Sequence, residues 1–195
     1  MLAEQQVLEV LSSTPAIHAV RQLAAQASVS VSLTGGALRD LFLGLTPINF
    51  DFVVEGDADA LAGRVANLAP GGALGAVSES GTIRYRGDLG RLAFIPAKGL
   101  SVDAFLTRHV DFTVNALACD LRALTIVDRH GSLADIESQI IRNHPSTGFA
   151  SKPAHFALRA VRMVLTMPAL RLDANTRADI ERHADLVGAD PADVG

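Results

Sequence analysis

The chain has 195 residues, of which 49% are hydrophobic and 19% charged, and a formal net charge of −4. This composition supports a hydrophobic core, excludes disordered and low-complexity classes, and argues mildly against a general nucleic-acid binder. The single cysteine, Cys119, excludes an internal disulfide and a cysteine-rich zinc site, and no apolar run reaches the roughly 18 residues that a membrane span needs. We therefore expect a cytoplasmic protein that has no membrane segment.

Helices and strands are predicted to alternate through the first part of the chain. Apolar residues at helical spacing and a break near Pro15 indicate helices, whereas alternation of small polar with apolar residues indicates a strand. Asp57 is a candidate N-cap. The expected elements are a broken helix over 4–27, a strand over 28–34, a helix over 37–42, a strand over 50–55 and a helix over 58–69.

Strands and then helices are predicted for the remainder. The strands are expected at 73–78, 82–87 and 92–96, and the helices at 111–118, 133–138, 153–166 and 173–187. Pro, Ser, Thr and Gly gather between His144 and Ser151, where a boundary is expected. Residues 1–147 are thus predicted to form an α/β domain and residues 148–195 a helical one.

A diglycine turn joins the first predicted strand to the short helix after it. Gly35 and Gly36 permit a tight turn and let a ligand approach the N–H groups that begin the helix. Arg39 lies within reach of the same anion, and Asp40 is expected to fix it by an ion pair. The pattern indicates a phosphate-binding turn, with a plain tight turn as the alternative.

Two polar residues share one face of the second predicted strand. Because side chains alternate along a strand, Asn49 and Asp51 point to one side and Phe50 and Phe52 to the other, into the core. Polymerase-type chemistry uses two carboxylates in such a place to hold two Mg²⁺ ions. Asn49 offers only a neutral oxygen, so Asp51 is the candidate metal ligand. The alternative is that both residues simply end an edge strand.

Five motifs follow one another from about residue 28 to the end. They are Gly35-Gly-Ala-Leu-Arg39-Asp40 with Gly44, Asn49-Phe-Asp51-Phe-Val-Val-Glu-Gly56, Asp111-Phe-Thr-Val-Asn115-Ala, a run from Val127-Asp128 to Ile141-Arg142, and Leu158-Arg159-Ala-Val-Arg162 with Leu172-Asp173. In this order and at this spacing they resemble the head domain and neck of bacterial poly(A) polymerases and class II tRNA nucleotidyltransferases, the CCA-adding enzymes.

The resemblance implies both a fold and an activity. The fold is an α/β (α+β) head of the polymerase-β nucleotidyltransferase type, with a small mixed sheet and flanking helices over residues 1–147, followed by an incomplete helical neck over 148–195. The activity is transfer of a nucleotidyl group from a nucleoside triphosphate to an RNA 3′ end, such as that of tRNA, with Mg²⁺ as cofactor.

The resemblance also assigns candidate site residues. Asp51 and Asn49 take the catalytic position, with Asp51 as the metal ligand. The nucleotide-binding residues are Gly35, Gly36, Arg39, Asp40, Asp111, Asn115, Arg159 and Arg162. Asp111 and Asn115 belong to the segment that holds the ribose, although Asp111 also suits a helix N-cap. Arg159 and Arg162 share one helix face, which either meets the triphosphate or lies in solvent.

Several positions depart from the family pattern. Asn49 replaces the first aspartate, Ala93 stands at a third acidic position, and Val110 stands where arginine is usual. The neck residues that read the base are replaced by Pro153 and Phe156 or, with one gap, by Lys152 and His155. Neither pair presents a carboxylate and a guanidinium to a base edge.

These departures leave two functions open. The first is an enzyme that transfers nucleotides to RNA with weak or altered activity, because Mg²⁺ binding is weak or lost. The second is a catalytically degenerate module that binds nucleotides or RNA. Arg84 and Arg86 alternate on one strand face, as either a small basic patch or a solvated surface.

Overall fold

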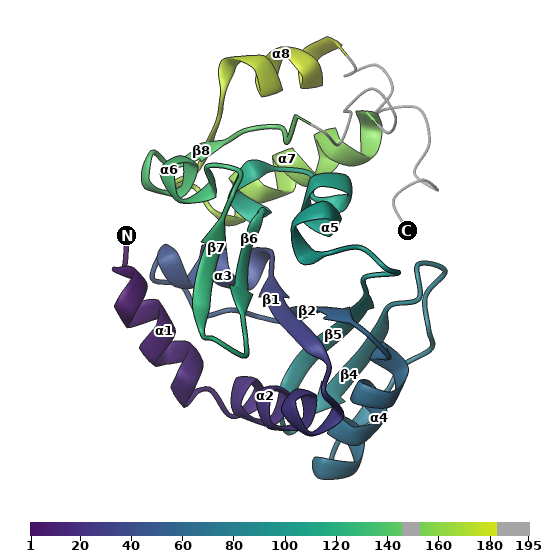
Figure 1. Cartoon of the computed structure of the whole chain (residues 1–195). Helices are drawn as coiled ribbons and strands as arrows, with labels where there is room; N and C mark the ends of the chain where they lie inside the picture. Colours follow the sequence, from purple (N-terminus) through teal and green to yellow (C-terminus); the bar gives the residue numbers. More distant parts are fainter. Residues whose placement is uncertain (146–152, 183–195) are drawn as a thin grey trace.

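The computed structural model describes residues 1–145 and 153–182 (Figure 1). Its centre is a seven-stranded mixed sheet in the order β3-β4-β5-β2-β1-β6-β7. All neighbouring strands run antiparallel except β2 and β5, which run parallel. The strands are β1 Ser30–Thr34, β2 Phe50–Glu55, β3 Ala73–Leu74, β4 Ile83–Gly87, β5 Gly90–Pro96, β6 Leu117–Asp120 and β7 Thr125–Asp128.

Helices begin where the sequence supplies a suitable first residue. Pro15 starts α2 because its fixed φ and missing N–H suit the first helical position. The Asp57 carboxylate accepts the Ala60 N–H at 2.9 Å and so caps α4 as predicted. The helices are α1 Glu4–Ser13, α2 Pro15–Ala27, α3 Gly36–Phe42, α4 Ala58–Leu68, α5 Val102–His109, α6 Ser132–Glu137, α7 Pro153–Thr166 and α8 Ala174–Arg182, with a 3₁₀ turn, η1, at Thr113–Asn115.

The core lies between the sheet and its helices. Phe52 on β2 and Phe94 on β5 are fully buried, and their rings stack at 5.6 Å between centroids. Leu61 and Val65 from α4 belong to the same buried cluster. This core fixes β2, so that its opposite face, which carries Asp51, is held in place.

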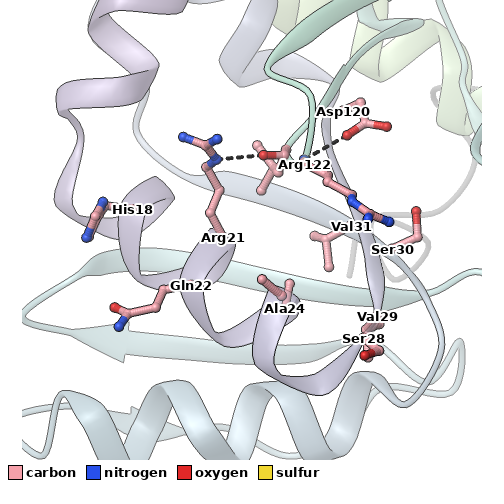
Figure 2. A pocket seen from close by; sticks show the side chains of 12 residues that line it. His18, Arg21, Gln22, Ala24, Ser28, Val29, Ser30, Val31, Asp120 and Arg122 are labelled. Carbon is pink, nitrogen blue, oxygen red and sulfur yellow. Dashed lines mark hydrogen bonds between the residues drawn. The ribbon is translucent and has the colours of Figure 1, made fainter.

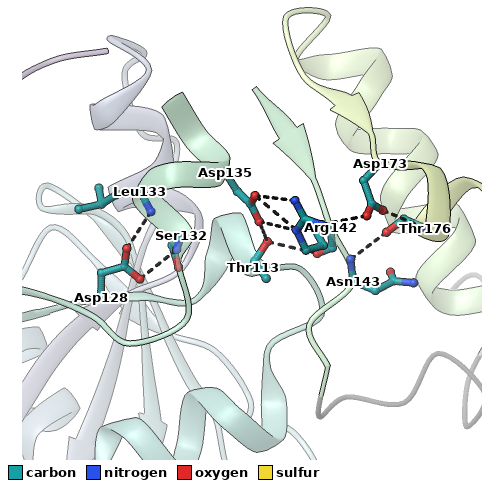
Figure 3. A network of polar contacts seen from close by, with 9 residues as sticks. All are labelled: Thr113, Asp128, Ser132, Leu133, Asp135, Arg142, Asn143, Asp173 and Thr176. Carbon is teal, nitrogen blue, oxygen red and sulfur yellow. Dashed lines mark hydrogen bonds and ion pairs between the residues drawn. The ribbon is translucent and has the colours of Figure 1, made fainter. Parts of the chain in front are cut away.

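A polar network joins α8 to the head (Figure 3). The Arg142 guanidinium, whose pKa is raised by its hydrogen bonds to Asp135, pairs with Asp135 and Asp173, each at 3.2 Å. The Thr176 hydroxyl accepts the Asn143 N–H at 2.9 Å. Beside this network β8 (Ile140–Ile141) pairs in parallel with β9 (Arg171–Leu172).

The division of the chain at residue 147 stays a prediction, because residues 146–152 lie outside the described part. The end of the last predicted helix, from residue 183 on, lies outside it too. Within the described residues no helix has the length and apolarity needed to cross a membrane.

The predicted helix at 111–118 is wrong. Residues 113–115 form only one 3₁₀ turn, and residues 117–120 are strand β6 between β1 and β7. Helix α5 and strand β7 were not predicted, the strand expected at 73–78 pairs only at Ala73–Leu74, and the C-terminal part contains the short strand β9. The first strand starts at Ser30 rather than at residue 28, because Ser28 ends α2 with φ +53°.

Candidate nucleotide site

The diglycine turn lies between β1 and α3, as the sequence predicts. Gly35 has φ +74°, a conformation that a side chain disfavours. A Cβ added there would lie 3.9 Å from Asp51 Oδ2, and one added at Gly36 would lie 3.1 Å from Arg39 Nη2. The turn therefore brings the main chain close to both the aspartate and the arginine that the sequence singles out.

Asn49 and Asp51 lie side by side at the start of β2. The Asn49 amide Nδ2 donates a hydrogen bond to Asp51 Oδ1 at 2.9 Å. Burial raises the pKa of the Asp51 carboxyl, against the lowering effects of the Asn49 hydrogen bond and of the charges of Arg84 and Arg159. Compared with a free carboxyl group, the environment thus shifts Asp51 toward its protonated form.

The neighbouring strands supply arginines beside Asp51 instead of further acids. Ala93 on β5 is the register partner of both Asp51 on β2 and Arg84 on β4. A pocket of about 230 Å³ opens here, lined by Asn49, Asp51, Arg84, Tyr85, Arg86, Arg91, Leu92 and Ala93. One carboxylate and three guanidinium groups therefore surround the pocket.

This residue set does not fit a pair of Mg²⁺ ions. Such ions require several oxygen ligands, with carboxylates to offset their charge. Among the described residues, Asp51 is the only carboxylate that lines the pocket, and the Asn49 amide group already donates to it. Residues 1–145 and 153–182 contain no group of three or more His, Cys, Asp and Glu side chains that could hold a metal ion.

A second polar group joins α3, η1 and α7. Arg39 donates to Asp40 Oδ1 from Nε at 3.0 Å and from Nη2 at 2.7 Å, which is the predicted ion pair. Its Nη1 donates to Asn115 Oδ1 at 2.5 Å, and Asn115 Nδ2 donates to Asp111 Oδ1 at 3.0 Å. Arg159 Nε pairs with Asp111 Oδ2. We call these five residues the Arg39–Arg159 network.

The network shows what Asp111 does within the fold. Its carboxylate accepts the Phe112 N–H at 2.8 Å and the Asn115 side chain, and it does not cap the 3₁₀ turn. Asp111 and Asn115 are 7% and 8% exposed, so their polar groups depend on each other and on Arg159. The structure thus brings Arg39, Asp111, Asn115 and Arg159 together without a ligand.

The remaining candidates lie on or near α7. The exposed Arg162 guanidinium has no ion-pair partner among the described residues. Of the positions aligned with the base readers, His155 is exposed and Phe156 is half-buried. Lys152 lies outside the described residues.

Sequence reasoning missed Arg91 as a site residue. The hairpin of β4 and β5 sets Arg91 directly opposite Arg86. The signal was present in the short turn Gly87-Asp-Leu-Gly90, which fixes that register once a hairpin is assumed.

Another pocket, of about 630 Å³, lies between α2, the start of β1 and the β6–β7 turn (Figure 2). Arg21 Nε donates to the Leu121 carbonyl at 2.6 Å, and the Arg122 N–H donates to Asp120 Oδ1 at 2.7 Å. None of the predicted site residues lines it.

The chain is similar to known proteins along most of its length. It is 29% identical over 177 residues to a CC-adding tRNA nucleotidyltransferase of Geobacter sulfurreducens, with 90% of this chain and 40% of that protein covered. It is 32% identical over 153 residues to a multifunctional CCA protein of Xylella fastidiosa, with 71% and 35% covered. No protein-family model matches the chain.

Solved structures lead to the same family. A Thermotoga maritima CCA-adding enzyme complexed with tRNA superposes with a TM-score of 0.76 at 26% identity, covering 92% of this chain and 45% of that one. The chain spans less than half the length of these relatives. The expected mixed α/β fold is confirmed, and the chain belongs to the tRNA nucleotidyltransferase family, whose head domain it contains.

Proposed function

We propose that this protein acts in RNA 3′-end processing and that its head domain binds a nucleoside triphosphate for nucleotidyl transfer to an RNA 3′ end. The observation that carries the proposal is the Arg39–Arg159 network beside the Gly35 turn. Residues from α3, η1 and α7 meet there at hydrogen-bond distances, although they are far apart in the sequence.

The network suits a nucleotide because its groups are already held in place. Each polar group has a partner, so binding requires little reordering of side chains. The Gly35–Gly36 turn lets a triphosphate approach the main chain closely, and Asp111 and Asn115 offer acceptors to the ribose hydroxyls. Three of the five N–H donors of Arg39 are used inside the chain, which leaves donors for a phosphate.

An RNA partner is proposed from the relatives. Two are named tRNA nucleotidyltransferase and CCA-adding enzyme, and the latter is complexed with tRNA. We therefore propose an RNA 3′ end, that of tRNA in particular, as the acceptor. Mg²⁺ belongs to this chemistry, yet the pocket beside Asp51 fits it poorly.

A second candidate function is a nucleotide-binding module that does not transfer nucleotides. The observation that favours it is the Asp51 pocket, where Asn49 and Ala93 stand in place of two acids. Loss of one metal carboxylate costs on the order of 10³-fold in rate. Little base preference is expected in either case, since His155 and Phe156 on α7 cannot present a carboxylate and a guanidinium to a base edge.

Incorporation of each labelled nucleoside triphosphate into an RNA primer, with and without Mg²⁺, tests the proposal. Extension that is abolished by Asp51→Ala supports transfer, whereas nucleotide binding without extension supports the second candidate. Absence of both binding and extension for all four nucleotides would contradict both. Arg64→Ala is the control, because Arg64 is exposed on α4 and does not line the pocket.

A further inference from the structure

Three arginines line the pocket beside Asp51. Arg84 and Arg86 are exposed at alternate positions of β4, and Arg91 is exposed on β5. Within the described residues none of the three forms an ion pair. Because Arg86 and Arg91 are direct cross-strand partners, their like charges disfavour the fold unless an anion lies between them.

The pocket itself does not supply enough negative charge. In the part of the chain that the structure describes, Asp51 is the only carboxylate that lines it, against three guanidinium groups. Ala93 lies between Asp51 and Arg84 in the sheet, because it is the register partner of both. An acidic residue at this position would separate Asp51 from Arg84, but alanine carries no charge. The pocket thus carries a net charge of about +2 when all four groups are ionised.

We propose that this pocket binds the phosphate chain of a nucleoside triphosphate directly through Arg84, Arg86 and Arg91, without a divalent metal ion. The inference rests on the proposed function, since it assumes that a nucleotide is the ligand. The guanidinium groups take over the neutralisation of phosphate charge, and each one binds phosphate oxygens in a bidentate manner.

A triphosphate suits the pocket better than an RNA strand does. The pocket is a half-open hollow of about 230 Å³, and a Cβ added at Gly35 would lie 3.9 Å from the Asp51 Oδ2 atom that faces the turn. A triphosphate concentrates three or four negative charges in such a space, whereas an RNA backbone spreads one charge per nucleotide along a groove. The three arginines that line the pocket therefore suit one compact anion better than an extended strand.

Calorimetric titration with ATP and with inorganic tripolyphosphate, in EDTA and in Mg²⁺, tests this inference. Both ligands are expected to bind in EDTA at least as tightly as in Mg²⁺, because Mg²⁺ neutralises the charge that the arginines recognise. Arg84→Ala and Arg86→Ala are each expected to weaken binding in EDTA about tenfold or more, since each removes charge-assisted hydrogen bonds. Arg64→Ala, an exposed arginine on α4, is the matched control and should leave binding unchanged.

The outcomes separate this inference from the proposed function. ATP binding that requires Mg²⁺ and is insensitive to Arg84→Ala would overturn the inference and leave nucleotide binding intact. Metal-free binding of ATP that depends on Arg84 would support it even if no RNA primer were extended. An RNA oligomer that binds through Arg84 while tripolyphosphate does not bind would also overturn it. Thermal melts of each variant exclude unfolding as the cause.

Discussion

The Arg39–Arg159 network and the Asp51 pocket differ in how completely their charges are paired. In the network Asp111 is buried and shares its oxygens among Arg159, Asn115 and a backbone N–H. In the pocket a single carboxylate faces three arginines that lack ion-pair partners in the described chain. Paired charges hold a preformed site in place, whereas unpaired charges are available to an anionic ligand. The network therefore fixes α3, η1 and α7 relative to one another, while the pocket differs chemically from a metal site.

The largest expected effect comes from removing the central carboxylate of the network. Asp111→Ala leaves the Asn115 amide and the Phe112 N–H without an acceptor and Arg159 without its partner. We expect a loss of about 3 kcal/mol in the free energy of unfolding, measured by urea denaturation. Glu79→Ala, at an exposed loop position, should change it by less than about 0.5 kcal/mol. Equal losses would show that the network does not hold the fold.

Restoring acids to the pocket should make it responsive to Mg²⁺. The double variant Asn49→Asp with Ala93→Glu sets three carboxylates together and so supplies the charged oxygen ligands that Mg²⁺ requires. Saturating Mg²⁺ should raise its melting temperature above the value in EDTA, since a ligand at 100 times its Kd adds about 2.7 kcal/mol. The parent and a variant with Ala93→Gln should show no Mg²⁺-dependent shift in melting temperature. Equal shifts in all three proteins would mean that positions 49 and 93 do not face a metal site.

An intermediate loss in the free energy of unfolding is expected when the ion pairs of Arg142 beside α8 are removed. Arg142→Ala removes the ion pairs to Asp135 and Asp173, which are both largely buried, and should cost about 1 to 2 kcal/mol. Arg129→Ala removes an exposed pair with Asp103 at 3.8 Å and should cost about 0.5 kcal/mol or less. Urea denaturation of the two variants compares them directly, and a larger cost for Arg129→Ala would contradict this account.

The smallest expected effect follows from the raised pKa of Asp51. The folded protein holds the Asp51 proton more tightly than the unfolded chain does. Stability is therefore lost as the pH rises from below 3.8 through the folded-state pKa. Asp51→Asn should melt at a higher temperature than the parent at pH 7, and the difference should vanish below pH 3.8. Asp88→Asn, in the exposed hairpin turn, is the control for the removal of one carboxylate.

Much of the fold was predictable because local signals agreed with tertiary structure. The strand at 50–55 and the helix at 153–166 have the predicted bounds, and Asp57 caps α4. Residues 111–120 were not predictable in this way. Leu117, Ala118 and Cys119 are all buried, so the strand does not alternate and resembles a helical segment. The 3₁₀ turn before it depends on a distant contact, from the Thr113 hydroxyl to Asp135.

The candidate site was also predictable only in part. Sequence patterns predicted the Gly35 turn, the Arg39–Asp40 ion pair and the placement of Asn49 and Asp51 on one strand face. They did not predict the neighbours of Asp51, because these come from the parallel pairing of β2 with β5 and from the β4–β5 hairpin. Such register is a property of the assembled sheet, which no single motif specifies.

The most direct test of the central claim is an amide NMR spectrum of the protein titrated with Mn²⁺, a paramagnetic ion that suits the same oxygen ligands as Mg²⁺. We predict that ATP in EDTA shifts the signals of residues 35–39 and 84–91. We also predict that Mn²⁺ at roughly stoichiometric concentration, without nucleotide, leaves the signals of residues 49–55 sharp. Broadening centred on Asp51 under those conditions would show a working metal site and contradict the account.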